Sequence, residues 1–409
     1  MNRLLWLCIG RVGTCMGTMA FAGALPVLTS AWAMDARTAG GIQTALNLAN
    51  ALALFVAAYV SDRFGAQRVY LFCIWSGVVA LSVFALFATS AASALPLIVL
   101  VGLTQGGAYA PAMILAADMS STASRGRAMG MVLASGSLGY MLGIVLALWG
   151  ATEYGATVGL GICAVGGLLG AAMGHLSLRG EGRASCQIES PNALPSVPAA
   201  EWRSGVGPAS CCLFVGYVAH CWELLGNFAW TPSLLATVLG PLELGAMSTG
   251  LIIGATIHLS GMAATYLLAA LSDKWHRTHV LIAVAGVGAV CSLLMGISAQ
   301  WGPVWTVAIA AVGSFFIFGD SGVLTAAMTE EVPSELLGRI MAVRSVMGFG
   351  AGALAPMCFG AVFDVTGRWE WAYGVLALGG IIALLAAVAL RRFRVGRVGL
   401  PSALTAKVD

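Results

Sequence analysis

The chain has 409 residues, of which 59% are hydrophobic and only 9% charged, whereas soluble domains carry about 25% charged residues. Together with a mean hydropathy of +0.91, this composition excludes a soluble enzyme, a disordered chain and a coiled coil. It also excludes an outer-membrane barrel, whose strands alternate and whose mean hydropathy is low. The formal net charge of +3 is too small to indicate a nucleic-acid partner. The composition therefore predicts an all-α membrane protein embedded in a lipid bilayer.

Apolar stretches of about 20 residues, each long enough to cross a bilayer, recur twelve times along the chain. The first is expected to be a retained span rather than a signal peptide, because its apolar run is too long and contains Arg11. The predicted spans are 4–28, 40–61, 69–89, 94–118, 127–150, 156–178, 209–235, 247–271, 278–298, 302–327, 339–362 and 371–390.

A proline-rich segment with several charges divides these spans six and six. Its composition is typical of a linker between two compact units. The predicted organisation is an N-terminal six-helix bundle at 1–178, a cytoplasmic linker at 179–208, a C-terminal six-helix bundle at 209–394 and a cytoplasmic tail at 395–409.

The basic residues are distributed unevenly between the two ends of the predicted spans. With the N-terminus inside, sixteen of the 20 Lys and Arg fall on cytoplasmic segments, and only Arg37 and Arg368 fall outside. Because cytoplasmic loops carry an excess of Lys and Arg, we expect both termini in the cytoplasm. The predicted location is a bacterial-type plasma (inner) membrane.

The two halves of the chain resemble each other. Ser-Asp-Arg at 61–63 returns as Ser-Asp-Lys at 272–274, 211 positions later, and Gly-Arg at 126–127 returns at 338–339, 212 positions later. Matches at nearly one offset indicate an internal duplication. They predict two pseudo-symmetric six-helix bundles that face each other across a cleft near the middle of the membrane.

The loop after the second span carries a motif with a known relative. Its residues are Asp62, Arg63, Phe64, Gly65 and Arg68, echoed in the second half by Asp273 and Lys274. This motif, with twelve spans in a six-plus-six repeat, resembles the major facilitator superfamily over nearly the whole chain. The resemblance implies that the loop is a conformational motif, in which the Asp lies at a helix N-terminus and stabilises the outward-open state. The sequence departs from the family at span 4, where no Arg precedes Gln105.

Span 7 carries polar residues on one helical face. His220, Glu223, Asn227 and Trp230 follow one another at steps of three, four and three, and side chains three or four apart are neighbours on a helix. Such a stripe is expected to face a wet cavity. Hydrogen bonding between helices inside one bundle is the alternative.

Span 8 carries His258 and Met262, four residues apart, and the repeat places Asn47 of span 2 at the depth of His258. This agreement favours a cavity-lining histidine, with a satisfied buried histidine as the alternative. The helices that line the central cavity in the family contain the remaining candidates. The predicted substrate-binding residues are Arg11, Asn47, Gln105, Tyr109, His220, Asn227, Trp230 and His258.

Two carboxylates lie well inside predicted spans, away from their ends, where ionisable groups are costly and usually functional. Glu223 and Asp320 are the predicted proton-coupling residues, and His220 is close enough to Glu223 on its helix to relay a proton. A structural ion pair between Asp320 and Arg344 is the alternative for the second carboxylate.

These observations predict a secondary transporter that moves a small solute by alternating access, coupled to protons, acting as a monomer without a cofactor and not as an enzyme. The chain contains no phosphate-binding loop, so ATP drive is not indicated. One alternative is copper import through a metal site at His258 and Met262, since imidazole and thioether suit Cu(I). The other is a non-transporting membrane sensor or enzyme.

Overall fold

The computed structural model describes residues 3–121, 124–179 and 207–398. These residues are almost entirely helical, and twelve helical segments are long and apolar enough to cross a membrane. The predicted all-α fold with twelve transmembrane helices is therefore confirmed.

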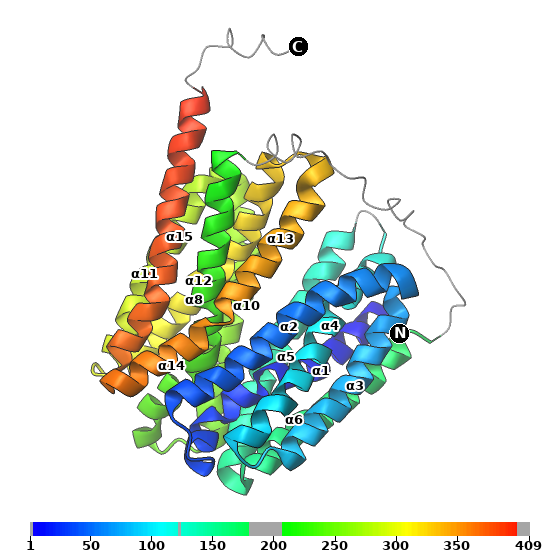
Figure 1. Cartoon of the computed structure of the whole chain (residues 1–409), viewed down its shortest axis with the longest axis vertical. Helices are drawn as coiled ribbons and strands as arrows, with labels where there is room; N and C mark the ends of the chain where they lie inside the picture. Colours follow the sequence, from blue (N-terminus) through cyan, green and yellow to red (C-terminus); the bar gives the residue numbers. More distant parts are fainter. Residues whose placement is uncertain (1–2, 122–123, 180–206, 399–409) are drawn as a thin grey trace.

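The N-terminal bundle contains six uninterrupted helices, drawn from blue to green in Figure 1. They are α1 (Arg3–Ala31), α2 (Ala36–Phe64), α3 (Ala66–Phe87), α4 (Ala91–Asp118), α5 (Arg125–Tyr154) and α6 (Ala156–Ser177).

The C-terminal bundle has six spans, and the two interrupted ones are span 8 and span 11. Span 7 is α8 (Pro208–Leu239), which continues into η2 (Gly240–Leu242). Span 8 is built from α9 (Ala246–Gly254), the π-helical turn η3 (Ala255–Leu259) and α10 (Ser260–Lys274). The remaining elements are α11 (Arg277–Ser298), α12 (Pro303–Glu331), α13 (Ser334–Gly352), α14 (Ala355–Thr366) and α15 (Trp369–Val398).

The helices extend past several predicted span ends. The largest difference is in α15, which runs to Val398 although the apolar stretch ends at 390. The reason is that hydropathy reports the apolar band, whereas backbone hydrogen bonding continues through Arg391 and Arg392. Most of the predicted linker 179–208 and tail 395–409 lies outside the described residues, so the predicted domain boundaries stay predictions.

Span 11 breaks between α13 and α14 at a proline. Pro356 occupies the first turn of α14, where its missing N–H is tolerated, but in an unbroken helix its ring would clash with the carbonyl four residues earlier. The break separates a longer arm, α13, from the short helix α14, which lies beside α2 at the lower end of Figure 1.

The two bundles are joined at that end, which we call the sealed end. Both carboxylate oxygens of Asp364 on α14 accept backbone N–H bonds from the start of α2, from Ala36 at 2.8 Å and Arg37 at 2.7 Å. The N-cap of α2, Asp35, accepts a further bond from the Thr38 backbone N–H at 2.7 Å, and its hydrogen bonds with Thr38 lower the pKa of Asp35. The N-terminus of α2 is thus satisfied by both halves of the protein.

Glycines allow the helices of the sealed end to approach closely. A Cβ on Gly40 of α2 would lie 2.2 Å from the Pro356 carbonyl oxygen, and a Cβ on Gly360 of α14 would lie 2.1 Å from that of Ala36. A second close contact between the two halves joins α9 to α5, where a Cβ on Gly250 would lie 3.0 Å from the Cα of Val145. Backbone-to-backbone contact of this kind is typical of helix packing in membranes.

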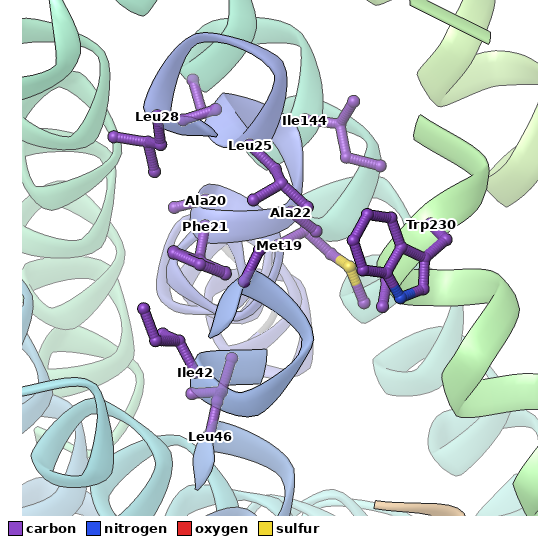
Figure 2. Close-up of a cluster of buried hydrophobic side chains, with 14 of the residues drawn as sticks. Met19, Ala20, Phe21, Ala22, Leu25, Leu28, Ile42, Leu46, Ile144 and Trp230 are labelled. Atoms are coloured by element: carbon purple, nitrogen blue, oxygen red, sulfur yellow. The ribbon is translucent and has the colours of Figure 1, made fainter. Parts of the chain in front are cut away.

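A buried apolar cluster fills the space behind these contacts. Its members come from both bundles, and Figure 2 shows Trp230 of α8 opposite Met19, Ala22 and Leu25 of α1. Because the cluster has members from both halves, it adds apolar contacts between them at the sealed end.

Candidate functional site

A buried ionisable pair joins α8 to α12. His220 Nδ1 lies 2.7 Å from Asp320 Oδ1, and the other ring nitrogen, Nε2, lies 2.8 Å from the hydroxyl of Ser321. His220 is 1% exposed and Asp320 is 5% exposed. The pair thus places a carboxylate against an imidazole away from water, although neither facing atom has a partner with hydrogen-bond geometry.

Asp320 also borders a small cavity inside the C-terminal bundle. The cavity of about 10 Å³ lies among α8, α11, α12 and α15, and Asp320 is the charged residue in an otherwise mostly apolar lining. Such a volume holds about one water molecule. Asp320 therefore has both a titratable partner and room for a small polar guest.

Glu223, the second predicted coupling residue, contacts α11 and α15. Its Oε1 accepts a hydrogen bond from Ser292 of α11 at 2.6 Å, and the same oxygen would lie 2.7 Å from a Cβ on Gly380 of α15. The carboxylate thus lies between α8, α11 and α15, inside one bundle. This placement agrees with the alternative interpretation of the span-7 stripe, hydrogen bonding between helices inside one bundle, because the neighbours of a 4% exposed side chain are set by tertiary packing.

Asn227 and Trp230 are also engaged by packing. The side chain of Asn227 donates to the Glu223 carbonyl at 2.8 Å and accepts from Thr231 at 3.2 Å. Trp230 donates to the Pro356 carbonyl at 3.0 Å and stacks on Phe359 with ring centroids 4.9 Å apart. Trp230 therefore belongs to the sealed end in this conformation rather than to an open cavity.

His258 lies in the π-helical turn, an irregularity that is frequent at functional sites. Its ring centroid is 5.6 Å from those of Tyr140 and Phe228 and 6.0 Å from that of Phe318. Tyr140 belongs to α5 of the other half, so this aromatic cluster spans both bundles. His258 is 1% exposed, and neither ring nitrogen has a hydrogen-bond partner.

The structure adds no third ligand to the metal site predicted at His258 and Met262 among the residues it describes. Met262 is half-buried one turn after His258. Among the described residues, no group of three or more His, Cys, Asp and Glu side chains could hold a metal ion.

Arg11 of α1 is buried among tyrosines. Its guanidinium carbon lies 5.6 Å from the centroid of the Tyr109 ring on α4. Arg11 is 4% exposed, and its Nη1 is buried without a hydrogen-bond partner. The structure therefore brings together two residues that the sequence proposed separately, Arg11 and Tyr109.

Two other predicted positions have local partners. Gln105 of α4 accepts a hydrogen bond from Thr18 of α1 at 3.2 Å. Asn47 accepts from Gln43 at 3.2 Å, while its own Nδ2 is buried without a partner. Gln43 and Asn47 share a helical face with Gly40, which contacts α14, so these amides face the other half.

Arg344 is not the partner of Asp320. Its guanidinium carbon lies 4.0 Å from the Tyr217 ring centroid, and Nη2 donates to Thr325 at 3.0 Å. The predicted alternative pairing is corrected because His220 lies closer to the carboxylate than the arginine does and takes its place.

The conformational motif lies at the end opposite the sealed end. Gly65 ends α2 with φ +87°, a backbone conformation that only glycine adopts readily. Asp62, Arg63 and Arg68 are exposed there, with the guanidinium of Arg63 5.6 Å from the Phe64 ring.

In the second half, the equivalent loop belongs to an ion-pair network. Arg277 lies 3.2 Å from Asp273 and also pairs with Glu330, while Arg394 pairs with Glu331 at 2.7 Å. The network links α10, α11, α12 and α15. The neighbouring Lys274 is exposed at the end of α10.

Several contacting residues did not emerge from the sequence, among them Gln43, Tyr140, Ser292 and Ser321. Tyr140 had a signal, since it is an aromatic hydroxyl inside a predicted span. The two serines did not, because small hydroxyl residues are common in membrane helices.

Comparisons with known proteins agree with this architecture. A sequence profile described as Major Facilitator Superfamily matches residues 7–356. A protein of Cupriavidus pinatubonensis (strain JMP 134 / LMG 1197), named "Probable 4-methylmuconolactone transporter", is 27% identical over 344 residues, covering 81% of this chain and 77% of its own length.

Solved structures share the fold at low sequence identity. A mutant of the nucleoside transporter NupG superposes with a TM-score of 0.75 at 14% identity, covering 95% of this chain and 100% of its own. A bacterial homolog of the human lysosomal transporter Spinster, solved in an inward-facing and occupied conformation, gives a TM-score of 0.72 at 16% identity, covering 96% of both chains. With a profile match over most of its length and this fold, the chain belongs to the Major Facilitator Superfamily of membrane transporters.

Proposed function

We propose that this protein is a proton-coupled secondary transporter that moves a small organic solute by alternating access of its two halves. The observation that carries the proposal is the sealed end. There α2 meets α14 through glycine contacts and the Asp364 hydrogen bonds, none of which involves a covalent link. Contacts of this kind can open and close as two rigid bundles rock against each other.

The orientation and conformation follow from the charge distribution. The sealed end carries Arg37 and Arg368, the basic residues predicted to lie outside the membrane. Closure at that end corresponds to an inward-facing state. Similarity to a relative whose structure is described as inward-facing supports this assignment.

Proton coupling is assigned to the pair formed by His220 and Asp320. Protonation of the carboxylate removes the charge that holds the imidazole, so it weakens the link between α8 and α12. The same helix α8 carries Trp230 into the sealed end. A proton thereby changes the relative free energies of the two conformations, which is the requirement for coupling.

The solute is proposed from the relative. The name of the Cupriavidus protein makes 4-methylmuconolactone the first compound to test. Copper import has less support, because His258 is surrounded by aromatic rings rather than by sulfur ligands.

Uptake of labelled 4-methylmuconolactone into proteoliposomes tests the proposal. We expect accumulation to require an imposed pH gradient. Asp320→Asn should lose accumulation but retain exchange of labelled for unlabelled solute, because exchange needs no net proton movement. Glu330→Gln is the matched control, since this acid lies on the same helix in an exposed ion pair with 43% side-chain exposure. Accumulation that is independent of the gradient would refute proton coupling.

Glu223→Gln tests the other carboxylate in the same assay. Glutamine retains an acceptor for the Ser292 hydroxyl, so the packing of α8 against α11 should survive. Loss of accumulation with intact exchange would assign Glu223 a coupling role. Unchanged accumulation would confine coupling to Asp320.

A further inference from the structure

The described spans bury two arginines, Arg11 and Arg344, and neither is paired with a carboxylate of the described residues. Arg11 and Arg344 are 4% and 3% exposed; Nη1 of Arg11 and both Nε and Nη1 of Arg344 are buried without hydrogen-bond partners. The buried carboxylates of the described residues, Glu223 and Asp320, are engaged by Ser292 and His220. Since an uncompensated buried charge is costly, the space around these arginines favours an anion.

Arg11 makes the looser side-chain contacts of the two. The Tyr109 ring centroid lies 5.6 Å from its guanidinium carbon, and Tyr140 also lies within electrostatic range of the guanidinium. Gly136 of α5 lies beside this side chain, since a Cβ there would come to 4.0 Å from the Arg11 Nε. By contrast, Arg344 lies directly over Tyr217 at 4.0 Å and donates to Thr325.

Tyr140 connects the surroundings of Arg11 to the contact between the halves. Its ring lies 5.6 Å from His258 and 6.5 Å from Phe228, both of the C-terminal bundle. Both nitrogens of His258 lack hydrogen-bond partners. Aromatic faces with one unsatisfied imidazole suit a flat, unsaturated body that carries an oxygen acceptor or donor.

We propose that the solute is a small organic anion, that Arg11 binds its carboxylate, and that its flat body packs against the rings of Tyr140 and His258. A guanidinium presents two parallel N–H donors that match the two oxygens of a carboxylate. This inference deepens the proposed function by naming the substrate class and its binding residue. Because Tyr140 and His258 come from opposite halves, bound solute would contact both.

Binding to purified protein tests the inference independently of transport. The probes are carboxylate and neutral pairs of the same shape: benzoate with benzamide, cis,cis-muconate with its diamide, and 4-methylmuconolactone with its methyl ester. Ligand-induced shifts of the unfolding temperature in detergent report binding. We expect the wild-type protein to bind at least one carboxylate at least tenfold more tightly than its neutral counterpart.

Substitutions of the buried arginines then test which guanidinium binds the carboxylate. Removing one partner of a buried charge pair usually weakens binding about 30-fold or more, so Arg11→Gln should lose the preference for the carboxylate. Arg11→Lys keeps the positive charge but lacks the two parallel N–H donors of a guanidinium, so it should retain part of the preference for the carboxylate. Arg344→Gln is the matched control, since it removes an equally buried guanidinium from the other half, and it should leave the preference in place.

The outcomes separate this inference from the proposed function. If no carboxylate is preferred by the wild-type protein, or if Arg11→Gln binds the carboxylate as tightly as wild type, the anion site is refuted even where transport occurs. If carboxylates bind through Arg11 but proteoliposomes show no uptake, the transport proposal fails and the site remains. Should Arg11→Gln not fold, the wild-type comparison of paired probes and Arg11→Lys still decide.

Discussion

At the scale of single residues, glycines decide where charged side chains can be buried. Gly380 of α15 leaves the space into which Glu223 extends: a Cβ there would lie 2.7 Å from Oε1 and 2.9 Å from the Cα of Ala289. Overpacking in a tight interior typically costs about 1–3 kcal/mol. Gly380→Ala should therefore lower the unfolding temperature in detergent.

Gly374→Ala provides the matched control for this prediction. It lies in the same helix, and its Cβ would meet nothing within 4 Å. Replacing a helical glycine by alanine gains about 0.5–1 kcal/mol where space allows, so this variant should unfold at the same or a higher temperature. Equal destabilisation of both variants would contradict the proposed packing of Glu223.

The hydrogen bond from Ser292 to Glu223 leads to a second prediction at this scale. Ser292→Ala leaves a buried carboxylate oxygen without its donor, which costs about 1–3 kcal/mol. We expect a clear loss of thermal stability. In the control Ser76→Ala, the lost bonds run to carbonyls of the preceding turn in the same helix, and stability should change little.

At the scale of helices, the sealed end depends on the approach of α2 to α14. Gly40→Ala would place a Cβ 2.2 Å from the Pro356 carbonyl oxygen, so the two helices must separate. A penalty of 1–3 kcal/mol on one of two conformations changes their ratio about 5–150-fold. The sealed conformation should therefore lose population in favour of the one open at this end.

Pulsed electron resonance between spin labels measures this change. Labels at Tyr154 of α5 and Val365 of α14, which are 62% and 87% exposed, report the separation of the halves in a variant without native cysteines. Gly40→Ala should add a longer distance component. The neighbouring Gly41→Ala, whose Cβ would meet nothing within 4 Å, should give the wild-type distribution. A wild-type distribution for both variants would contradict the role of the glycine contact.

Asp364 supplies polar contacts between α14 and α2 at the sealed end. Its carboxylate accepts two backbone N–H groups at the start of α2, where the helix dipole favours negative charge by about 0.3–1 kcal/mol. Asp364→Asn should shift the same spin-label distances by a smaller amount than Gly40→Ala. The control Asp35→Asn alters the same helix N-terminus from within one half, so it should leave the distances unchanged.

The sequence predicted the positions of the helices better than the side-chain contacts between them. Twelve spans followed from hydropathy, because the bilayer requires each apolar stretch to satisfy its own backbone hydrogen bonds. The break at Pro356 and the π-helical turn at His258 did not, since both preserve the apolar pattern. Likewise, helical spacing placed His220 and Glu223 on one face, but the packing of α12 and α11 directs one toward Asp320 and the other toward Ser292.

At the scale of the whole molecule, the sealed end becomes informative about function once the protein is oriented in its membrane. The excess of Lys and Arg on one side predicts that the loops after α2 and α10 face the cytoplasm. The sealed end, with Arg37 and Arg368, then faces outward. Closure on the outside is the state in which a transporter exchanges solute with the cytoplasm.

Cysteine labelling in intact cells tests this orientation. In a variant without native cysteines, single cysteines are introduced at Thr89, between α3 and α4, and at Gln67, at the start of α3; both positions are exposed. A membrane-impermeant maleimide should label the Thr89→Cys protein at once and the Gln67→Cys protein only after the cells are made permeable. The two positions lie at opposite ends of the same helix, so each serves as the control for the other. The reverse pattern would place the sealed end inside, and the conformation described here would then be outward-facing, with the predicted direction of solute exchange reversed.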